Sequence, residues 1–210
     1  MLDSIATQFN SGGPFMWIIL GLFAVACAVV VERLVYYFIT CRGKGHALVS
    51  DISNALEEDD VEKARTVAGS KSTPLHNLLK AAVDKYGSGA TPEKIQEGIE
   101  EAAILELPKT TQRLNYLSLL ANIATLLGLL GTIAGLQVSF SSLASVDAAQ
   151  KASMLASGIS QAMNTTACGL IVAVPCMVMF TALSNKQQSL VKEIDASVVK
   201  LANYMKAKLA

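Results

Sequence analysis

The 210-residue chain has 17 basic and 17 acidic side chains, so its formal net charge is zero, and 52% of its residues are hydrophobic. This balance excludes the basic surface on which nucleic-acid-binding proteins depend, and we expect no nucleic-acid partner. The four cysteines form no CxxC pair, which excludes the common zinc and redox motifs.

Three stretches of the chain, residues 14–31, 116–140 and 158–183, contain no charged side chain. Each is about as long as a helix that crosses a ~30 Å hydrocarbon core. Three helices buried in a soluble protein are the alternative, but the remaining polar chain is too short to cover them. The first stretch has neither a preceding basic region nor a small-residue cleavage site, so we expect it to be retained and not removed as a signal peptide. The chain is therefore predicted to be an all-α, three-span helical membrane protein in the lipid bilayer, with long helices that extend into a cytoplasmic helical region.

Basic residues are distributed unevenly between the parts that link these stretches. Residues 1–13 contain no Lys or Arg, residues 33–113 contain eleven, the link after the second stretch contains only Lys151, and the tail after residue 184 contains five. Because basic residues stay on the cytoplasmic side, we expect the N-terminus to be periplasmic and the C-terminus cytoplasmic in a bacterial inner membrane. The predicted parts are an external N-terminal segment (1–13), a first membrane helix (14–40), a cytoplasmic helical region (41–113), a second membrane helix (114–140), a short external link (141–157), a third membrane helix (158–184) and a cytoplasmic C-terminal helix (185–210).

The cytoplasmic region has several signals for the start of a helix. A Thr-Pro pair, which supplies a cap and a first-turn proline, stands at residues 73–74 and again at 91–92. Asp59 or Asp60 is expected to cap another helix. The helix that begins after the second pair is expected to run into the second span past a kink at Pro108.

The C-terminal tail carries an apolar stripe at helical spacing, formed by Leu190, Ile194, Val198, Leu201 and Met205. We expect this stripe to pack on its own chain or on a second subunit, and not to lie on the membrane surface, because the preceding span already anchors it.

No motif indicates an enzyme. The two histidines, His46 and His76, are isolated in the sequence, and the glycines near residue 131 lack the Lys-Ser/Thr pair of a phosphate-binding loop. We therefore expect no catalytic residue, no metal site and no bound organic cofactor.

Small and hydroxyl-bearing residues recur on one face of the second span, where Gly128, Thr132, Gly135 and Ser139 follow at steps of four, three and four. The third span has a matching face that includes Gly158, Ala162 and Gly169. Such faces let two helix backbones approach closely. We assign five glycines to helix packing: Gly128, Gly131, Gly135, Gly158 and Gly169.

Amides and paired hydroxyls stand in the third span. Gln161 and Asn164 are three residues apart, and Thr165 and Thr166 follow directly. A threonine can return its hydroxyl to its own helix, so each threonine alone fits either local bonding or function. Amides are costly to leave unpaired in a membrane, so they should bond across helices or face a lumen.

Carboxylates are almost absent from this part of the chain. Between residues 114 and 185 the sequence contains only Asp147, which lies in the external link. An ion pathway along these two spans therefore needs a carboxylate from a partner helix.

Four segments carry a resemblance: LGLLGTIAG at 127–135, GISQA at 158–162, TACGLIVAVP at 166–175 and VERL at 31–34. They resemble the MotA/TolQ/ExbB proton-channel family, and three spans fit its ExbB/TolQ branch better than four-span MotA. The resemblance implies a homopentamer whose second and third helices line a pore. It also implies that the pore holds two copies of a single-span ExbD- or TolR-like partner, and that an intramembrane aspartate of this partner carries protons.

The resemblance assigns Thr132 and Thr166 to the ion pathway, and we add Thr165. We expect four further residues to line the pore or contact the partner: Gln161, Asn164, Thr125 and Ser139. Relatives of the ExbB type often have a glutamate where Gln161 stands, and an Ala-Pro pair where this chain has Ala124 and Thr125.

The predicted function is that of a stator-like subunit of an ion-driven inner-membrane motor that energises a partner with a periplasmic domain, for outer-membrane transport, envelope maintenance or motility. Protons are the expected coupling ion, and sodium is the alternative. A non-conducting membrane scaffold is the rival function. A small-solute transporter is disfavoured, because no inverted repeat or broken helix pair is visible.

Overall fold

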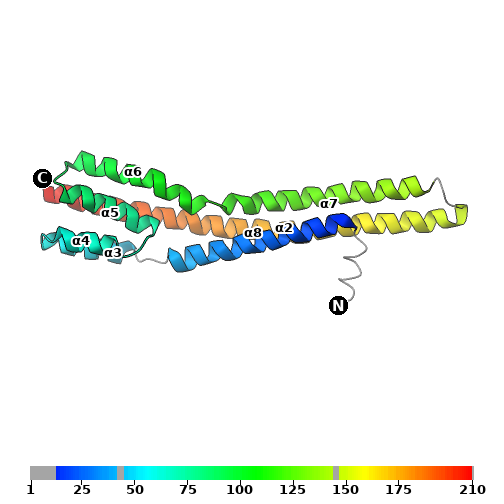
Figure 1. The fold of residues 1–210 in the computed structure, drawn as a ribbon, viewed down its shortest axis with the longest axis horizontal. Helices are drawn as coiled ribbons and strands as arrows, with labels where there is room; N and C mark the ends of the chain where they lie inside the picture. The colour runs from blue at the N-terminus through cyan, green and yellow to red at the C-terminus, as the bar shows by residue number, and fades with distance from the viewer. Residues whose placement is uncertain (1–12, 42–44, 144–146, 210) are drawn as a thin grey trace. The chain divides into compact units, whose positions relative to one another are not determined.

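The computed structural model describes residues 13–41, 45–143 and 147–209. Most of these residues are helical and none lies in a strand, so the predicted all-α class is confirmed. Apart from Gly13, the predicted external N-terminal segment lies outside the described residues. The helices, shown in Figure 1, are α2 (Pro14–Val35), the π-helix η1 (Tyr36–Thr40), α3 (Gly45–Glu57), α4 (Val61–Ala68), α5 (Pro74–Gly87), α6 (Pro92–Thr111), α7 (Leu114–Ser142) and α8 (Ala148–Leu209).

Three helical segments of the described residues are long and apolar enough to cross a membrane. They are Pro14–Phe38, Pro92–Ser142 and Ala149–Leu209, which confirms the prediction of three apolar helices of spanning length. The second segment comprises α6 and α7, and the third lies in α8, which continues without a break from Ala148 through the apolar stretch to Leu209.

One compact unit contains α2 up to Glu32, α7, and α8 up to Ala182. Its core is built from small side chains such as Ala26, Ala124 and Ala173, one from each of the three helices, which run side by side in Figure 1. The outer faces carry large exposed apolar side chains instead: Trp17 is 63% exposed and Ile171 is 70% exposed. Such faces are favourable where lipid or another subunit covers them.

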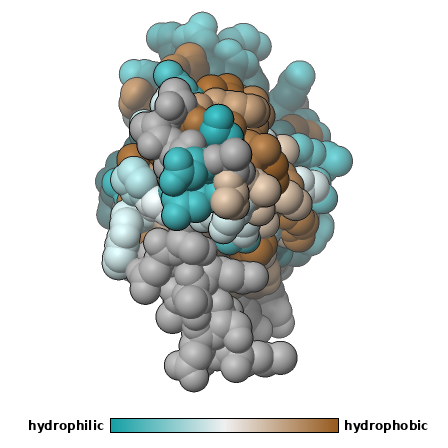
Figure 2. Space-filling view, turned by 90° about the vertical axis from the view of Figure 1, so that its right-hand side faces the viewer, coloured by the Kyte–Doolittle hydropathy of each residue, from teal (hydrophilic) through white to brown (hydrophobic). Residues whose placement is uncertain are grey.

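Figure 2 looks at the end where α7 is joined to α8. Hydrophilic and hydrophobic residues lie next to each other on this end of the molecule. Asp147, just before α8, and Lys151, in its first turns, are both exposed there.

The second compact unit contains Arg33–Gln112 and Leu183–Ala210. Its core collects apolar side chains from α3, α4, α5 and α6 around the last part of α8. Ile194, Leu201 and Met205 of the C-terminal stripe are at most 1% exposed in this core. The stripe therefore packs on its own chain, which is one of the two arrangements that we predicted.

Most of the predicted helix starts are present in this unit. Asp60 caps α4, because its carboxylate accepts a hydrogen bond of 2.8 Å from the amide of Lys63. Thr73 caps α5 and accepts from the amide of His76 at 3.4 Å, with Pro74 as the first helical residue. Thr91 likewise precedes α6, but its side chain makes no capping hydrogen bond within the described part of the chain.

The prediction of one helix that runs into the second span past a kink at Pro108 is wrong. α6 contains Pro108 and ends at Thr111, and α7 begins at Leu114. Between them Gln112 has an extended ψ of 141° and Arg113 has a φ of +63°, so helical hydrogen bonding stops there. A left-handed conformation is unfavourable for arginine and persists where other contacts hold it.

Candidate functional site

α7 and α8 meet along a seam of small residues. The glycines of the seam are Gly128, Gly131, Gly135, Gly158 and Gly169. A methyl group added at Gly169 would lie 2.6 Å from the carbonyl oxygen of Ala124, and one at Gly131 would overlap the side chain of Thr165. The two backbones are therefore so close that neither position has room for a larger side chain in the present packing.

The two threonines that the family resemblance assigned to the ion pathway bond differently. Thr166 lies on α8 and donates its hydroxyl proton across the seam to the carbonyl oxygen of Gly128, at 3.0 Å. Thr132 lies on α7 and donates to the carbonyl of Leu129 in its own helix, at 2.6 Å. Both side chains are half-buried. Because each hydroxyl already donates to a carbonyl, its remaining lone pairs can only accept a hydrogen bond or coordinate a cation.

Two other predicted site residues lie inside the seam. Thr165 is 1% exposed, packs against Gly131, and its hydroxyl donates to the carbonyl of Gln161 at 3.0 Å. Ser139 is buried against Gly158 and donates to the carbonyl of Gly135 at 2.8 Å. In the single chain these two hydroxyls belong to the contact between helices.

The remaining predicted residues lie at the edges of this seam. Thr125 is exposed on α7 and bonds back to the carbonyl of Ala121 at 3.1 Å. Asn164 and Gln161 are half-buried on α8. The side-chain nitrogen of Gln161 lies so close to Gly13 that a methyl group on that glycine would be 2.6 Å away. Gly13 has a φ of +74°, so the chain enters α2 through a conformation that favours glycine.

The apolar spans of this region contain no acidic side chain, and this absence determines their electrostatics. Asp147, just before α8, is the one acidic residue of the sequence between residues 114 and 185. The hydroxyls and amides can therefore accept, donate or solvate, but they cannot change charge near neutral pH. No carboxylate of these two apolar stretches is present to bind and release protons along this face.

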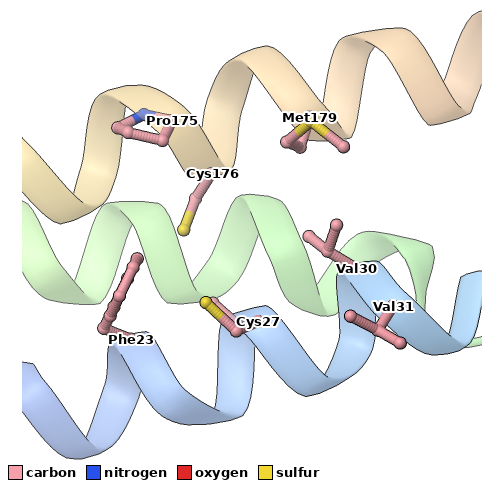
Figure 3. A pocket seen from close by; sticks show the side chains of 8 residues that line it. Phe23, Cys27, Val30, Val31, Pro175, Cys176 and Met179 are labelled. Atoms are coloured by element: carbon pink, nitrogen blue, oxygen red, sulfur yellow. The ribbon is translucent and has the colours of Figure 1, made fainter. Parts of the chain in front are cut away.

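A separate cavity of about 170 Å³ opens between α2 and α8. Figure 3 shows Phe23 and Cys27 of α2 on one side, and Pro175 and Cys176 of α8 on the other. All of its lining side chains are apolar or thiol-bearing. This cavity therefore offers no side-chain hydroxyl or amide to an ion.

An ion pair that sequence reasoning missed lies next to the spans. The guanidinium of Arg113 donates to the carboxylate of Glu32 at 2.7 Å, which connects the end of α2 with the start of α7. In the sequence, Glu32 stands out only as part of the VERL segment at 31–34, and nothing there pairs it with a residue 81 positions away. Both are charged residues that directly flank apolar stretches, which is the signal that could have suggested the pair.

The helical unit formed by Arg33–Gln112 and Leu183–Ala210 contains the isolated His76. Its ring nitrogen Nδ1 lies 2.7 Å from the hydroxyl of Thr73. Burial, together with nearby Lys71, lowers the pKa of His76. Within the described residues no group of three or more metal-binding side chains comes together.

The sequence of the chain matches a known protein family. The family model described as the MotA/TolQ/ExbB proton channel family matches residues 70–196. An ExbB-like 3 biopolymer transport protein of Synechocystis sp. is 29% identical over 87% of this chain and 88% of its own length. The Tol-Pal system protein TolQ of Pseudomonas aeruginosa is 25% identical over 84% of this chain and 86% of its own. An ExbB homologue of Methanothermobacter thermautotrophicus is 24% identical over 96% of this chain and 70% of its own.

Proposed function

The chain belongs to the MotA/TolQ/ExbB proton channel family, and we propose that it is the pore-forming, stator-like subunit of a proton-driven motor in the inner membrane. Five copies surround a pore lined by α7 and α8. The pore holds the single-span helices of an ExbD- or TolR-like partner, in two copies, each with an intramembrane aspartate. The N-terminus lies in the periplasm and the C-terminus in the cytoplasm.

The observation that carries this proposal is a polar helical face without an acid. Thr132 and Thr166 already donate their protons to carbonyls, so they offer lone pairs to a protonated carboxyl or to a hydrated ion. An ionised carboxylate is costly inside the bilayer, whereas a protonated one that donates to such a lone pair is much less so. The threonines therefore favour the protonated state of a partner aspartate beside them.

The energy available per proton determines how many protons the motor needs for work on its partner. One charge that crosses 100 mV releases about 2.3 kcal/mol. That energy is comparable with one or two hydrogen bonds, so work on a partner that reaches into the periplasm requires several proton transfers. A partner helix that turns or shifts inside the pore with each transfer meets this requirement.

Replacing the two hydroxyls tests the pathway. Thr132→Val and Thr166→Val keep the side-chain shape and remove the groups that accept from the partner acid. Loss of a hydrogen bond to a charged or ionisable group is worth about 1.5–3 kcal/mol, so proton flux should fall about tenfold or more. The flux is measured in proteoliposomes that contain the protein and its partner, under an imposed membrane potential.

Thr181→Val is the matched control, because Thr181 is an exposed residue of the same helix, α8, and bonds back to the carbonyl of Met177 at 3.0 Å. Its flux should equal that of the unchanged protein. Thr166→Ser should restore most of the flux that valine removes. Normal flux in both valine variants, with assembly intact by native mass spectrometry, would refute the hydroxyl pathway. Flux that follows the sodium gradient and ignores pH would instead make sodium the coupling ion.

Gln161 favours the second candidate function, a membrane scaffold that does not conduct. Its amide cannot titrate, and it lies against the backbone at Gly13. A pentamer that retains the partner but passes no ions under any gradient would establish the scaffold. A monomer or dimer in native mass spectrometry would contradict the pore itself.

A further inference from the structure

A pocket of about 380 Å³ lies between η1 and α8. η1 contributes Tyr37 and Phe38, and α8 contributes Lys186, Ser189, Leu190 and Glu193. All of these residues belong to one compact unit. The volume lies in the range of sites that bind small molecules, which is roughly 300–1,000 Å³.

The four α8 residues lie on one face of the helix, because Ser189, Leu190 and Glu193 follow Lys186 by three, four and seven positions. Lys186 and Glu193 stand at the two ends of this row, about 10.5 Å apart along the helix axis. The ammonium of Lys186 lies 5.4 Å from the centre of the Phe38 ring. The Glu193 carboxylate accepts a hydrogen bond of 3.1 Å from the amide of Gly45, at the start of α3. The pocket therefore carries one positive and one negative charge at separate positions.

The wall formed by η1 is held firmly. The hydroxyl of buried Tyr37 donates to the carbonyl of Thr110 at 2.6 Å. Single-turn π-helices occur frequently at functional sites. Here the π-helix directly follows Val35, and its residues Tyr37 and Phe38 line the pocket.

Both walls of the pocket lie where the chain leaves an apolar stretch. The apolar segment that begins at Pro14 ends at Phe38, and Lys186 follows closely after the uncharged stretch 158–183. Aromatic and lysine side chains at such positions lie at the level of the lipid headgroups. Lys186 is closer to the hydrocarbon than Glu193 along α8, so the positive charge is the inner one.

We propose that this pocket binds the headgroup of a zwitterionic aminophospholipid, with its phosphate at Lys186 and Ser189 and its ammonium at Glu193. In such a lipid the phosphate is attached to the glycerol, and the ammonium is further from the hydrocarbon, which is the order of the charges in the pocket. Phe38, whose ring lies beside the Lys186 ammonium, contacts the first part of the acyl chains. Leu190, between Ser189 and Glu193, contacts the short carbon link between phosphate and ammonium. An anionic headgroup would bring negative charge towards Glu193, and a choline headgroup has no N–H with which to donate to a carboxylate. This site is independent of the proposed ion pathway.

Lipid retention tests the proposal on the purified, full-length protein. Phosphatidylethanolamine, phosphatidylcholine and phosphatidylglycerol are offered in equal amounts, and bound lipid is counted by native mass spectrometry. We expect phosphatidylethanolamine to be retained about tenfold more strongly than either of the others, and Lys186→Gln and Glu193→Gln to remove this preference. The glutamine at position 193 still carries an oxygen that can accept from the amide of Gly45, so α3 keeps its contact.

Lys192→Gln and Asp195→Asn are matched controls, because both residues are exposed on α8 outside the pocket. They should retain phosphatidylethanolamine as the unchanged protein does, and thermal melting confirms that all four variants fold. Equal or stronger retention of phosphatidylglycerol, or an unchanged preference in Lys186→Gln, would overturn the proposal. Soluble phosphoethanolamine that displaces the lipid at equal concentration would overturn the assignment to a membrane lipid.

Discussion

Substitution of Gly169 by alanine probes the seam between α7 and α8 directly. The added methyl group would lie 2.6 Å from the carbonyl oxygen of Ala124 and 3.1 Å from the Cα of Gly128. Both neighbours are backbone atoms, so no side chain can rotate away. Relief requires the two helices to separate by about 0.8 Å before the first of these contacts reaches an ordinary 3.4 Å.

The cost follows from this separation. Overpacking of a well-packed contact costs about 1–3 kcal/mol. A rigid shift of the same size would also lengthen the 3.0 Å bond from Thr166 to Gly128 beyond hydrogen-bonding distance, at about 0.6 kcal/mol for a bond between membrane helices. Together these losses of about 1.6–3.6 kcal/mol lower the melting temperature by about 3–14 °C for a chain of this size.

Thermal melting of the purified protein in detergent measures the effect, with Gly21→Ala as the control. Gly21 lies in α2, and a methyl group there would meet nothing within 4 Å. Its substitution should leave the melting temperature unchanged or raise it slightly, because alanine favours a helix over glycine. A Gly169→Ala protein that melts at or above the temperature of Gly21→Ala would refute the close contact.

Two further predictions concern the helical unit formed by Arg33–Gln112 and Leu183–Ala210. Since the pKa of His76 is lowered in the folded protein, the unfolded chain binds more protons as the pH falls below about 6.5. The protection factors of the α5 amides, which correct for the slower intrinsic exchange at low pH, should therefore fall between about pH 7 and pH 5. His76→Asn should weaken this pH dependence, and equal slopes in both proteins would contradict the assignment. Asp60→Ala should destabilise α4 by about 1 kcal/mol in hydrogen exchange, whereas Asp60→Asn keeps the cap. Equal loss in both variants would show that the cap is not responsible.

Local chemistry made several elements predictable from short stretches of sequence. The caps Asp60 and Thr73 act on backbone amides three residues away, so the residues that decide them are neighbours in the chain. The break at Gln112 and Arg113 was not predictable in this way. Pro108 is the stronger local signal for an interruption, but α6 passes through it.

The roles of individual hydroxyls also depend on the packing of helices. Thr165 and Thr166 are adjacent in sequence, yet one bonds within α8 and the other crosses to Gly128. Successive residues of a helix point about 100° apart, so the direction of the neighbouring helix decides which of them reaches across. Sequence spacing placed both on or near the small-residue face and could not separate them.

The sequence by itself determined that three helices have the length and the apolar composition to cross a membrane, and that their polar face carries no acid. A bilayer requires an uncharged composition and a sufficient length of each span, and both can be read along the chain. Only the tertiary structure decided that Arg113 pairs with Glu32 and that η1 and α8 enclose a pocket between Phe38 and Lys186. These contacts join residues far apart in sequence, and their partners are set by how the helices pack.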